Sequence, residues 1–361
     1  MQQEELKNFF KDKKVLITGH TGFKGAWLTQ IMLNSGAKVC GYSLEPNTKP
    51  SMFEALELAG KIENNIADIR DLRKLNEVVA KFKPDIIFHL AAQPIVRDSY
   101  DNPVYTYETN VMGTVNVLES MRVNKIPAGV MITTDKVYKN FEKDIAYKEE
   151  DQLGGYDPYS NSKACADLVV SSYISSFFNP KDYKKKHNTL VASARAGNVV
   201  GGGDWAKDRL LPDAIKAFLV NKEDLVIRSP KAIRPWQHVL EPLYGYILLA
   251  MHLYNGESDK VGGWNFGPND EDMQEVEKVL QMLTGHLKHG KYIVEEDKSK
   301  HEAKLLKLDN AKSRKELNWI PKYDLSKTIK ETAEWYKVFH LSKGDIKNFT
   351  SNQIESYFAN N

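Results

Sequence analysis

Two short segments carry side chains whose types and spacing suit proton transfer. Tyr159 and Lys163 lie four residues apart in YSNSK, so a helix would place both on one face. An ammonium group beside a phenol lowers the phenol pKa from about 10, which makes a tyrosinate available as a base. The second segment, Thr134-Asp135-Lys136, offers an acid and an amine side by side. Taken alone, the first pair also arises often by chance, and the second segment also fits a capped turn with a solvated ion pair.

A glycine-rich segment near the N-terminus predicts a dinucleotide-binding loop. It follows the apolar run KVLIT with the spacing G-x-x-G-x-x-G. Such glycines permit a sharp turn, a close approach of pyrophosphate to the backbone, and tight packing of helix on strand. The N–H groups at the start of the next helix then face the phosphates. The predicted contacts are Gly19, Thr21, Gly22, Phe23, Lys24 and Gly25; an ordinary glycine-rich turn is the alternative.

The residues after the next two strands bear on which dinucleotide is bound. The second strand ends in Gly41-Tyr42-Ser43-Leu44 and lacks the carboxylate that usually holds the adenosine ribose. An arginine suited to a 2′-phosphate is missing there too, and we expect NAD. Asp68 and Ile69 are candidate adenine contacts, although Asp68 equally fits a turn or cap residue.

These segments follow strands in a repeating strand–helix pattern. Strands are expected at 14–18, 38–42, 61–67, 85–90, 129–133 and 191–194, and helices at 26–34, 71–82, 104–123 and 159–178. The pattern predicts an α/β fold with a Rossmann-type doubly wound parallel sheet, whose ligands bind at the carboxyl ends of the strands. We expect an NAD-binding domain with the catalytic residues over 11–196. A smaller mixed α/β substrate lobe is expected over 197–340, with some segments returning to the sheet, and a loosely held polar tail over 341–361.

The bulk composition excludes several classes of protein. Fifty Lys and Arg against 48 Asp and Glu leave a formal net charge of +2, without the basic excess typical of nucleic-acid or membrane-surface proteins. The sequence contains no apolar run long enough for a signal peptide or a membrane span. Cys40 and Cys165 have no metal-ligand spacing, and no metal is expected. We expect a cytoplasmic protein with a small-molecule partner.

Taken in order, the motifs resemble those of the extended short-chain dehydrogenase/reductase family, and within it the nucleotide-sugar 4,6-dehydratases. The resemblance covers roughly residues 11–337. It rests on GHTGFKG (19–25), HLAAQPIVRDSY (89–100), TNVMGTVNVLE (109–119), TTDKVY (133–138), YSNSK (159–163), ARAGNVVGGGDW (195–205), RPWQHV (234–239) and WIPKYDLSKTIKETAEWY (319–336).

The resemblance implies a mechanism for these side chains. Tyr159 removes the O4 proton of a hexose while C4 passes hydride to NAD⁺, and Thr134 hydrogen-bonds O4. Lys136, or a water that it positions, removes the C5 proton, and Asp135 in its acid form protonates the departing C6 hydroxyl. Hydride then returns to C6, which gives a 4-keto-6-deoxy sugar.

The resemblance also implies the binding residues and the assembly. Further cofactor contacts are Leu90, Ala91, Ala92, Gln93, Asn110, Thr133, Tyr159 and Lys163, and the nucleotide-sugar contacts are Asn198, Arg209, Arg234 and His238. Arginine forks match phosphate oxygens, whereas His238 equally fits a packed loop histidine. The helices expected over 104–123 and 159–178 are implied to form a four-helix bundle in a homodimer, with deep burial in one subunit as the alternative.

One departure within the family bears on the substrate. The dTDP-glucose and GDP-mannose dehydratases have a glutamate where this chain has Lys136, and the Asp-Lys pair resembles the CDP-glucose type. We therefore expect CDP-D-glucose, with a GDP- or UDP-linked hexose as the alternative and deoxysugar supply for lipopolysaccharide O-antigen as the implied pathway. An NDP-sugar 4-epimerase generally has a small hydroxyl residue in place of Asp135, and a non-enzymatic NAD-binding regulator typically loses Tyr159 or Lys163.

Overall fold

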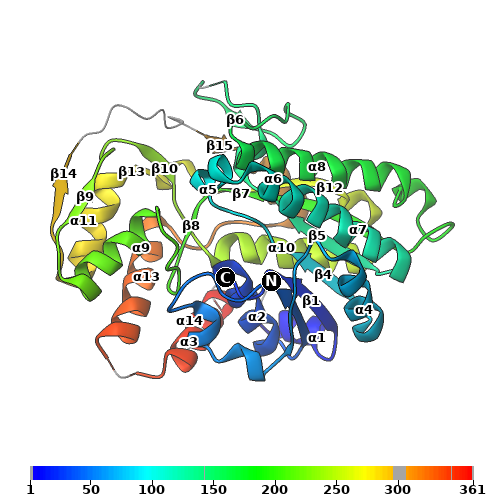
Figure 1. The fold of residues 1–361 in the computed structure, drawn as a ribbon, viewed down its shortest axis with the longest axis horizontal. Coiled ribbons are helices and arrows are strands. Elements are labelled where there is room, and N and C mark those ends of the chain that lie inside the picture. The colour runs from blue at the N-terminus through cyan, green and yellow to red at the C-terminus, as the bar shows by residue number, and fades with distance from the viewer. Residues whose placement is uncertain (1–2, 142, 296–305, 343, 360–361) are drawn as a thin grey trace.

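The chain folds around one parallel sheet of seven strands, in the order β12-β7-β5-β4-β1-β2-β3 (Figure 1). The computed structural model describes residues 3–141, 143–295, 306–342 and 344–359. The strands are β1 (Lys14–Thr18), β2 (Lys38–Ser43), β3 (Glu63–Ile66), β4 (Ile86–His89), β5 (Ala128–Ile132), β7 (Leu190–Ala196) and β12 (Gly262–Phe266). The predicted Rossmann-type class is confirmed, and β12 is a late segment that returns to the sheet beside β7.

Helices cover both faces of this sheet because its strands are apolar on both sides. In β1, Val15 and Ile17 join one buried cluster while Leu16 between them joins the other, as side-chain alternation requires. The first face carries α2 (Phe23–Asn34), α10 (Leu240–Tyr254) and α14 (Ile346–Ala359), and the second carries α4 (Leu72–Phe82), α7 (Gly113–Asn124) and α8 (Pro158–Ser176).

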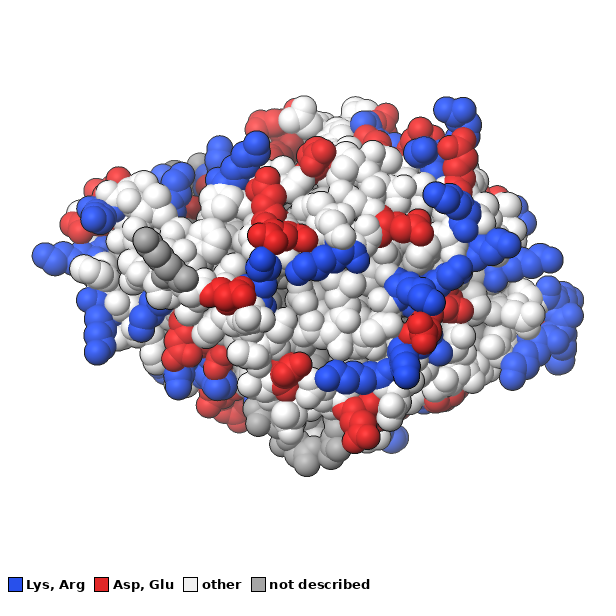
Figure 2. Space-filling model, turned by 90° about the horizontal axis from the view of Figure 1, so that it is seen from below, with Lys and Arg blue, Asp and Glu red and all other residues white. Residues whose placement is uncertain are grey.

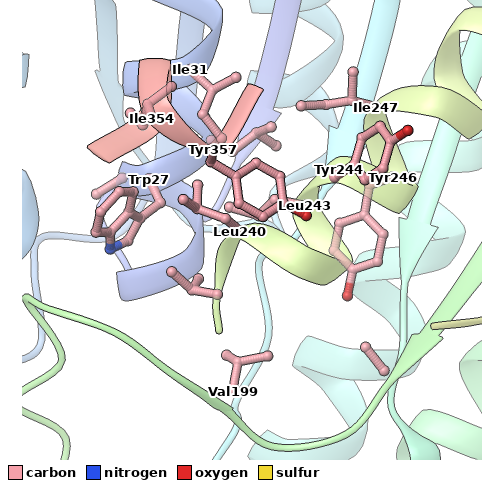
Figure 3. Packing of buried hydrophobic residues seen from close by; sticks show 14 of the residues in the cluster. Trp27, Ile31, Val199, Leu240, Leu243, Tyr244, Tyr246, Ile247, Ile354 and Tyr357 are labelled. Atoms are coloured by element: carbon pink, nitrogen blue, oxygen red, sulfur yellow. The ribbon is translucent and has the colours of Figure 1, made fainter. Parts of the chain in front are cut away.

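The C-terminal segment differs from the loosely held tail expected over 341–361. It forms α14, whose Ile354, Tyr357 and Phe358 are at most 2% exposed. Figure 3 shows Ile354 and Tyr357 packed beside side chains of α2 and α10. The Tyr357 hydroxyl donates to Glu241 Oε2 at 2.8 Å. Apolar burial and this hydrogen bond therefore fix the segment, of which residues 343, 360 and 361 lie outside the described ranges.

The helix expected over 104–123 is not a regular α-helix. It comprises α6 (Pro103–Tyr107), a π-helical turn over Glu108–Met112 and then α7. Asn110 lies within the π turn. Such turns occur mostly as single insertions in α-helices, often at functional sites, and this one faces α8.

The remaining elements are mostly short and build the second lobe and the sheet margins (Figure 1). The helices are α1 (Gln3–Phe10), α3 (Met52–Ala55), α5 (Val96–Asp101), α9 (Leu210–Ile215), α11 (Val276–Leu287), α12 (Ala311–Leu317) and α13 (Leu325–His340). The strands are β6 (Ala146–Tyr147), β8 (Val199–Val200), β9 (Leu225–Ile227), β10 (Ile233–Pro235), β11 (Gln237–His238), β13 (Met273–Glu275), β14 (Tyr292–Val294) and β15 (Lys307–Leu308).

The molecular surface mixes charges of both signs. Figure 2 shows acidic and basic side chains interspersed on the face seen from below, in keeping with the net charge of +2. Within the described ranges, no helix has the length and apolar character needed to cross a bilayer. Their His, Cys, Asp and Glu residues also form no group of three or more that could hold a metal ion.

Candidate active site

The glycine loop packs so closely that larger residues would not fit. Gly19 has φ +74°, and a Cβ there would lie 2.6 Å from the Ala91 nitrogen. A Cβ on Gly25 would lie 2.1 Å from the Gly19 carbonyl oxygen. Gly22 caps α2 without a side chain, so the unpaired N–H groups of the first turn remain available to phosphates. This geometry fits a dinucleotide.

Three predicted cofactor residues near the ends of β2 and β3 are engaged with the protein itself. The Thr21 hydroxyl donates to the Leu44 carbonyl at 2.8 Å and lies 2.9 Å from Ser43 Oγ, which ties the loop to the end of β2. Asp68 accepts three side-chain hydrogen bonds from Arg70, and this guanidinium lowers the pKa of the carboxyl group. Ile69 is buried, and its Cγ2 would lie 2.9 Å from a Cβ at Gly113 in α7.

The segment after β5 meets the start of α8, as the motifs predict. The Thr134 hydroxyl donates to Asp135 Oδ1 at 2.9 Å and lowers the pKa of the neighbouring Tyr159 phenol. Lys136 Nζ lies 3.8 Å from Asp135 Oδ1 and 3.5 Å from Asn198 Oδ1. Five predicted site residues, from β5, α8 and the loop after β7, therefore share one small region.

The electrostatics of Tyr159 differ from those expected. Burial raises the pKa of Tyr159, and the positive charges that oppose this shift come from Lys136 and then Arg209. Lys163 instead donates to the Ile132 carbonyl at 3.0 Å, and burial lowers the pKa of this lysine to about 8. The positive charge that acts most strongly on the Tyr159 pKa is therefore that of Lys136, while the Lys163 ammonium donates to the carbonyl at the end of β5; the pairing of Tyr159 with Lys163 stays a prediction.

The Asn110 side chain links the loop after β4 to helix α8 at the site. Its Oδ1 accepts from the Gln93 backbone N–H at 2.8 Å, and its Nδ2 donates to the Gln93 carbonyl at 3.1 Å and to Ser162 Oγ at 2.8 Å. The Ala91 N–H donates to Thr18 Oγ1 at 3.2 Å, which holds the rest of the Leu90–Gln93 loop. Asn110 thus positions the Gln93 backbone against α8, and its predicted contact with the cofactor stays a prediction.

A buried network behind the site was not predicted from the sequence as a unit. Arg195 donates to both carboxylate oxygens of Asp167 at 2.8 Å, and Ser193 and Thr133 hydroxyls donate to the same carboxylate. The Arg195 guanidinium also donates to the Tyr138 hydroxyl at 2.8 Å. Asp167 follows Lys163 by four residues on the helix, the one signal that could have placed it here. The Thr133 hydroxyl, predicted to touch the cofactor, is committed to this network.

Of the predicted substrate residues, three border the site and one does not. Arg209 forms a 2.8 Å ion pair with Asp204, Asn198 contacts Lys136, and Arg234 is half-buried on β10. Next to Arg234, the Pro235 ring would lie 3.5 Å from a Cβ at Gly197, whose other neighbour is Asp135 Oδ2 at 3.0 Å.

His238 lies in the core, contrary to the predicted substrate contact. It is 1% exposed, its ring packs against Trp27 and Tyr323, and burial lowers its pKa to about 4. His89 is also buried, with its ring nitrogens near the Thr18 and Thr114 hydroxyls. We therefore remove His238 from the candidate site.

Comparison with known proteins places this geometry in context. The model of the family described as GDP-mannose 4,6 dehydratase matches residues 16–332. A CDP-glucose 4,6-dehydratase of Salmonella typhimurium (strain LT2) is 50% identical over 355 residues, which cover 98% of each chain. A dTDP-glucose 4,6-dehydratase of Neisseria gonorrhoeae is 26% identical and covers 90% of this chain and 95% of its own.

Solved structures with less sequence identity share the fold. A UDP-glucose 4-epimerase from Thermus thermophilus in complex with NAD has a TM-score of 0.76 at 20% identity, covering 90% of this chain and 99% of its own. A dTDP-glucose 4,6-dehydratase from Bacillus anthracis, also in complex with NAD, has a TM-score of 0.71 at 23% identity, covering 90% and 96%. The fold is thus common to epimerases and dehydratases.

Proposed function

The chain belongs to the GDP-mannose 4,6-dehydratase family of extended short-chain dehydrogenases/reductases, and from this premise we propose that it converts CDP-D-glucose to CDP-4-keto-6-deoxy-D-glucose and water. It is an NAD-dependent lyase. The specific nucleotide follows from the relative at 50% identity over nearly the whole chain.

The observation that carries the proposal is the meeting of Tyr159 with Thr134, Asp135 and Lys136 at one strand end. A 4-epimerase needs one base at O4. Here a carboxyl group and an amine lie next to that base, and water elimination requires such an acid and base at C6 and C5. The Asp135-Lys136 pair therefore favours dehydration over epimerisation.

In the proposed mechanism Tyr159, Lys136 and Asp135 transfer protons. When bound, NAD supplies the hydride acceptor and donor. Tyr159 takes the O4 proton, with Thr134 orienting O4, and the positive charge of Lys136 stabilises the tyrosinate. Once its ammonium group has passed a proton to Asp135, 3.8 Å away, the neutral Lys136 amine, or a water that it positions, removes the C5 proton that the 4-ketone has acidified. Asp135 delivers a proton to the C6 hydroxyl, which leaves as water.

We assign the remaining site residues to binding of the nucleotide sugar or of the cofactor. We assign Arg209 and Arg234 to the diphosphate of the nucleotide sugar, since a guanidinium fork matches phosphate oxygens. Asn198 is assigned to the same diphosphate from the loop after β7. Lys163 is assigned to the nicotinamide ribose.

The assembly we propose is a homodimer through a four-helix bundle. Val104, Met112 and Leu168 are 50–70% exposed on the outer faces of α6, the π turn and α8. α6 and the π turn both pack beside α8, so these side chains belong to adjoining elements. Such exposed apolar side chains are typical of a face that a second copy covers. Sedimentation of the purified chain tests this assembly.

A substrate panel tests the activity. Purified protein is incubated separately with CDP-, dTDP-, GDP- and UDP-glucose and with GDP-mannose, and the product is read by mass. Loss of one water from CDP-glucose alone is the expected result. Loss of water from a different nucleotide sugar would correct the substrate, and an isomer of unchanged mass would indicate an epimerase instead. We further propose that the product supplies deoxysugar for lipopolysaccharide O-antigen in a cytoplasmic pathway.

A further inference from the structure

The Tyr246 hydroxyl is a buried polar group that the proposed mechanism does not use. Tyr246 lies in α10 and is 0% exposed, and none of the described residues accepts or donates a hydrogen bond at its hydroxyl oxygen. Nearly all buried polar atoms of native proteins have such a partner, and one without it costs free energy. A phenylalanine would fill the same place without that cost, so the hydroxyl indicates a ligand.

The contacts of the Tyr246 ring place it at the carboxyl ends of the strands. α10 packs against β5 and β7, and a Cβ on its Gly245 would lie 2.3 Å from Phe266 Cδ1, so the helix comes close to the end of β12. The Tyr246 ring packs edge-on against Phe266, with ring centroids 5.8 Å apart. Figure 3 shows the rings of Tyr244 and Tyr246 leaving α10 in different directions, and Tyr244 packs against α14 instead. The Tyr246 side chain therefore lies at the edge of the sheet where ligands of such folds bind.

Asp135 borders the same place. Phe266 ends β12 and is paired with the last residue of β7. The next residue is Gly197, where a Cβ would lie 3.0 Å from Asp135 Oδ2. Burial first, and then the negative charges of Tyr159 and Asp135, raise the pKa of the Tyr246 phenol. The Tyr246 hydroxyl and the reacting groups therefore share one region, which α10 approaches from one side and the segment after β5 from the other.

Two atoms in this region have the hydrogen-bonding capacity that a single water molecule needs. The Tyr246 phenol can donate its proton. Asp135 Oδ2 accepts no hydrogen bond from the described residues, whereas Oδ1 accepts from Thr134, and Asp135 is only 4% exposed. A water inside a protein needs about two to four polar partners, and these two atoms supply one donor and one acceptor.

We propose that the Tyr246 hydroxyl and Asp135 Oδ2 together bind one water molecule, and that the C6 oxygen takes this position as it leaves the sugar. The inference rests on the proposed function, which produces a water next to Asp135. When the C6–O bond breaks, the proton of the Asp135 carboxyl group joins the leaving oxygen. The new water then donates one hydrogen to the Asp135 carboxylate and accepts the Tyr246 O–H. A water held in this way is kept from adding back to the C5=C6 double bond.

A crystal structure of the NAD-bound, substrate-free protein tests the site without turnover, at a resolution that shows bound waters. We expect a water within hydrogen-bond distance of the Tyr246 hydroxyl and of Asp135 Oδ2, and we expect the Tyr246→Phe variant to lack it. A dry wild-type site, or a phenol bonded to another protein atom, would overturn the proposal. This test does not depend on the substrate panel, so a failure of the proposed function would be seen separately.

Stopped-flow absorbance in a single turnover tests the role of the hydroxyl. In Tyr246→Phe the reduced nicotinamide should appear at the wild-type rate, because the Tyr246 hydroxyl takes no part in removal of the O4 proton. Its decay, which follows water loss, should be on the order of tenfold slower, the effect of one hydrogen bond that is made as the water forms. Mass spectrometry of quenched samples measures the water loss itself.

Tyr357→Phe is the matched control, because Tyr357 is also 0% exposed but its hydroxyl donates to Glu241 at 2.8 Å. This variant should lower the midpoint of urea unfolding and leave both phases of the turnover unchanged. Tyr246→Phe should do the reverse, with an unchanged midpoint and a slower decay. Wild-type decay in a folded Tyr246→Phe would contradict the proposal. Equal slowing of both phases would contradict it too, because that result indicates a general distortion of the site.

Discussion

Two pairs of an acidic and a basic side chain lie near Thr133 and Thr134, and they differ in distance and in exposure to solvent. Asp167 and Arg195 are joined by two 2.8 Å hydrogen bonds, and both side chains are at most 5% exposed. Asp135 and Lys136 meet at 3.8 Å, with the lysine side chain 34% exposed. We call the buried Asp167–Arg195 pair the rear pair and the more loosely joined, partly exposed Asp135–Lys136 pair the front pair.

The difference indicates what each pair is for. Ser193 and Thr133 also donate to the Asp167 carboxylate, so its lone pairs are used and its position is fixed. Asp135 Oδ2 accepts no hydrogen bond from the described residues, and the Lys136 side chain is 34% exposed. A group that must give or take a proton needs an unoccupied atom facing its substrate. The rear pair holds β7 against α8, and the front pair is suited to chemistry.

The largest expected effect separates the pairs by activity. Asp135→Asn keeps the shape of the side chain but has no carboxylic proton to donate, so kcat should fall by about 10²–10⁴-fold. The free energy of unfolding should change little, because the contact with Lys136 is long and partly exposed. Steady-state kinetics and urea unfolding measure both, with Asp259→Asn on the surface as control. Near-normal turnover by Asp135→Asn would contradict its acid role.

The second effect is on stability. Arg195→Met leaves the buried Asp167 carboxylate without its partner, which should lower the free energy of unfolding by about 3–5 kcal/mol. Replacing both residues, with Asp167→Leu added, should recover part of this loss since no unpaired charge remains. Urea unfolding compares the three proteins. A loss below about 1 kcal/mol in the single variant would place this pair in the class of surface ion pairs.

The third test asks whether the front pair also tunes the phenol. Tyr159 acts as base only when deprotonated, so nicotinamide reduction by substrate should speed up as pH rises toward its raised pKa. Lys136→Met removes the charge that lowers this pKa, and the rise should move to higher pH. Lys136→Arg keeps the charge and should keep the profile. Stopped-flow absorbance of the reduced nicotinamide measures it.

The same two variants separate charge from proton transfer. Neither methionine nor arginine can take the C5 proton, so both should lose water on the order of 100-fold more slowly than wild type. Full dehydration by either variant would remove Lys136 from the mechanism, and identical pH profiles would remove its influence on Tyr159.

The smallest effect is expected at Thr133, which precedes Thr134 and contacts Asp167 of the rear pair. Thr133→Val removes the hydroxyl that donates to Asp167 at 3.0 Å, which should cost about 1 kcal/mol of unfolding free energy. The affinity for NAD should stay the same, because this hydroxyl is already engaged. A Kd for NAD that is raised more than tenfold in Thr133→Val would indicate that Thr133 contacts the cofactor.

Much of the fold was predictable because its signals are local. The strand predicted over 14–18 matches β1 residue for residue, and the glycine loop directly follows it. The helix α14 was missed although it carries a signal. Thr350, Gln353, Ile354, Tyr357 and Phe358 are buried and follow the i, i+3, i+4, i+7, i+8 spacing of an amphipathic helix, but two of the five are polar.

The sequence by itself determined which chemical groups lie at the ends of which strands. This was possible because the conformation of a β–α turn and the shared helix face of a Y-x-x-x-K motif depend only on residues close together in the chain. Only the tertiary structure decided which groups face one another. The charge of Lys136 acts on Tyr159, His238 is enclosed by Trp27 and Tyr323, and Asp167 meets an arginine 28 positions away. Hydrogen bonds and charges act over a few ångströms in space, and neighbours at that range are set by the packing of distant segments.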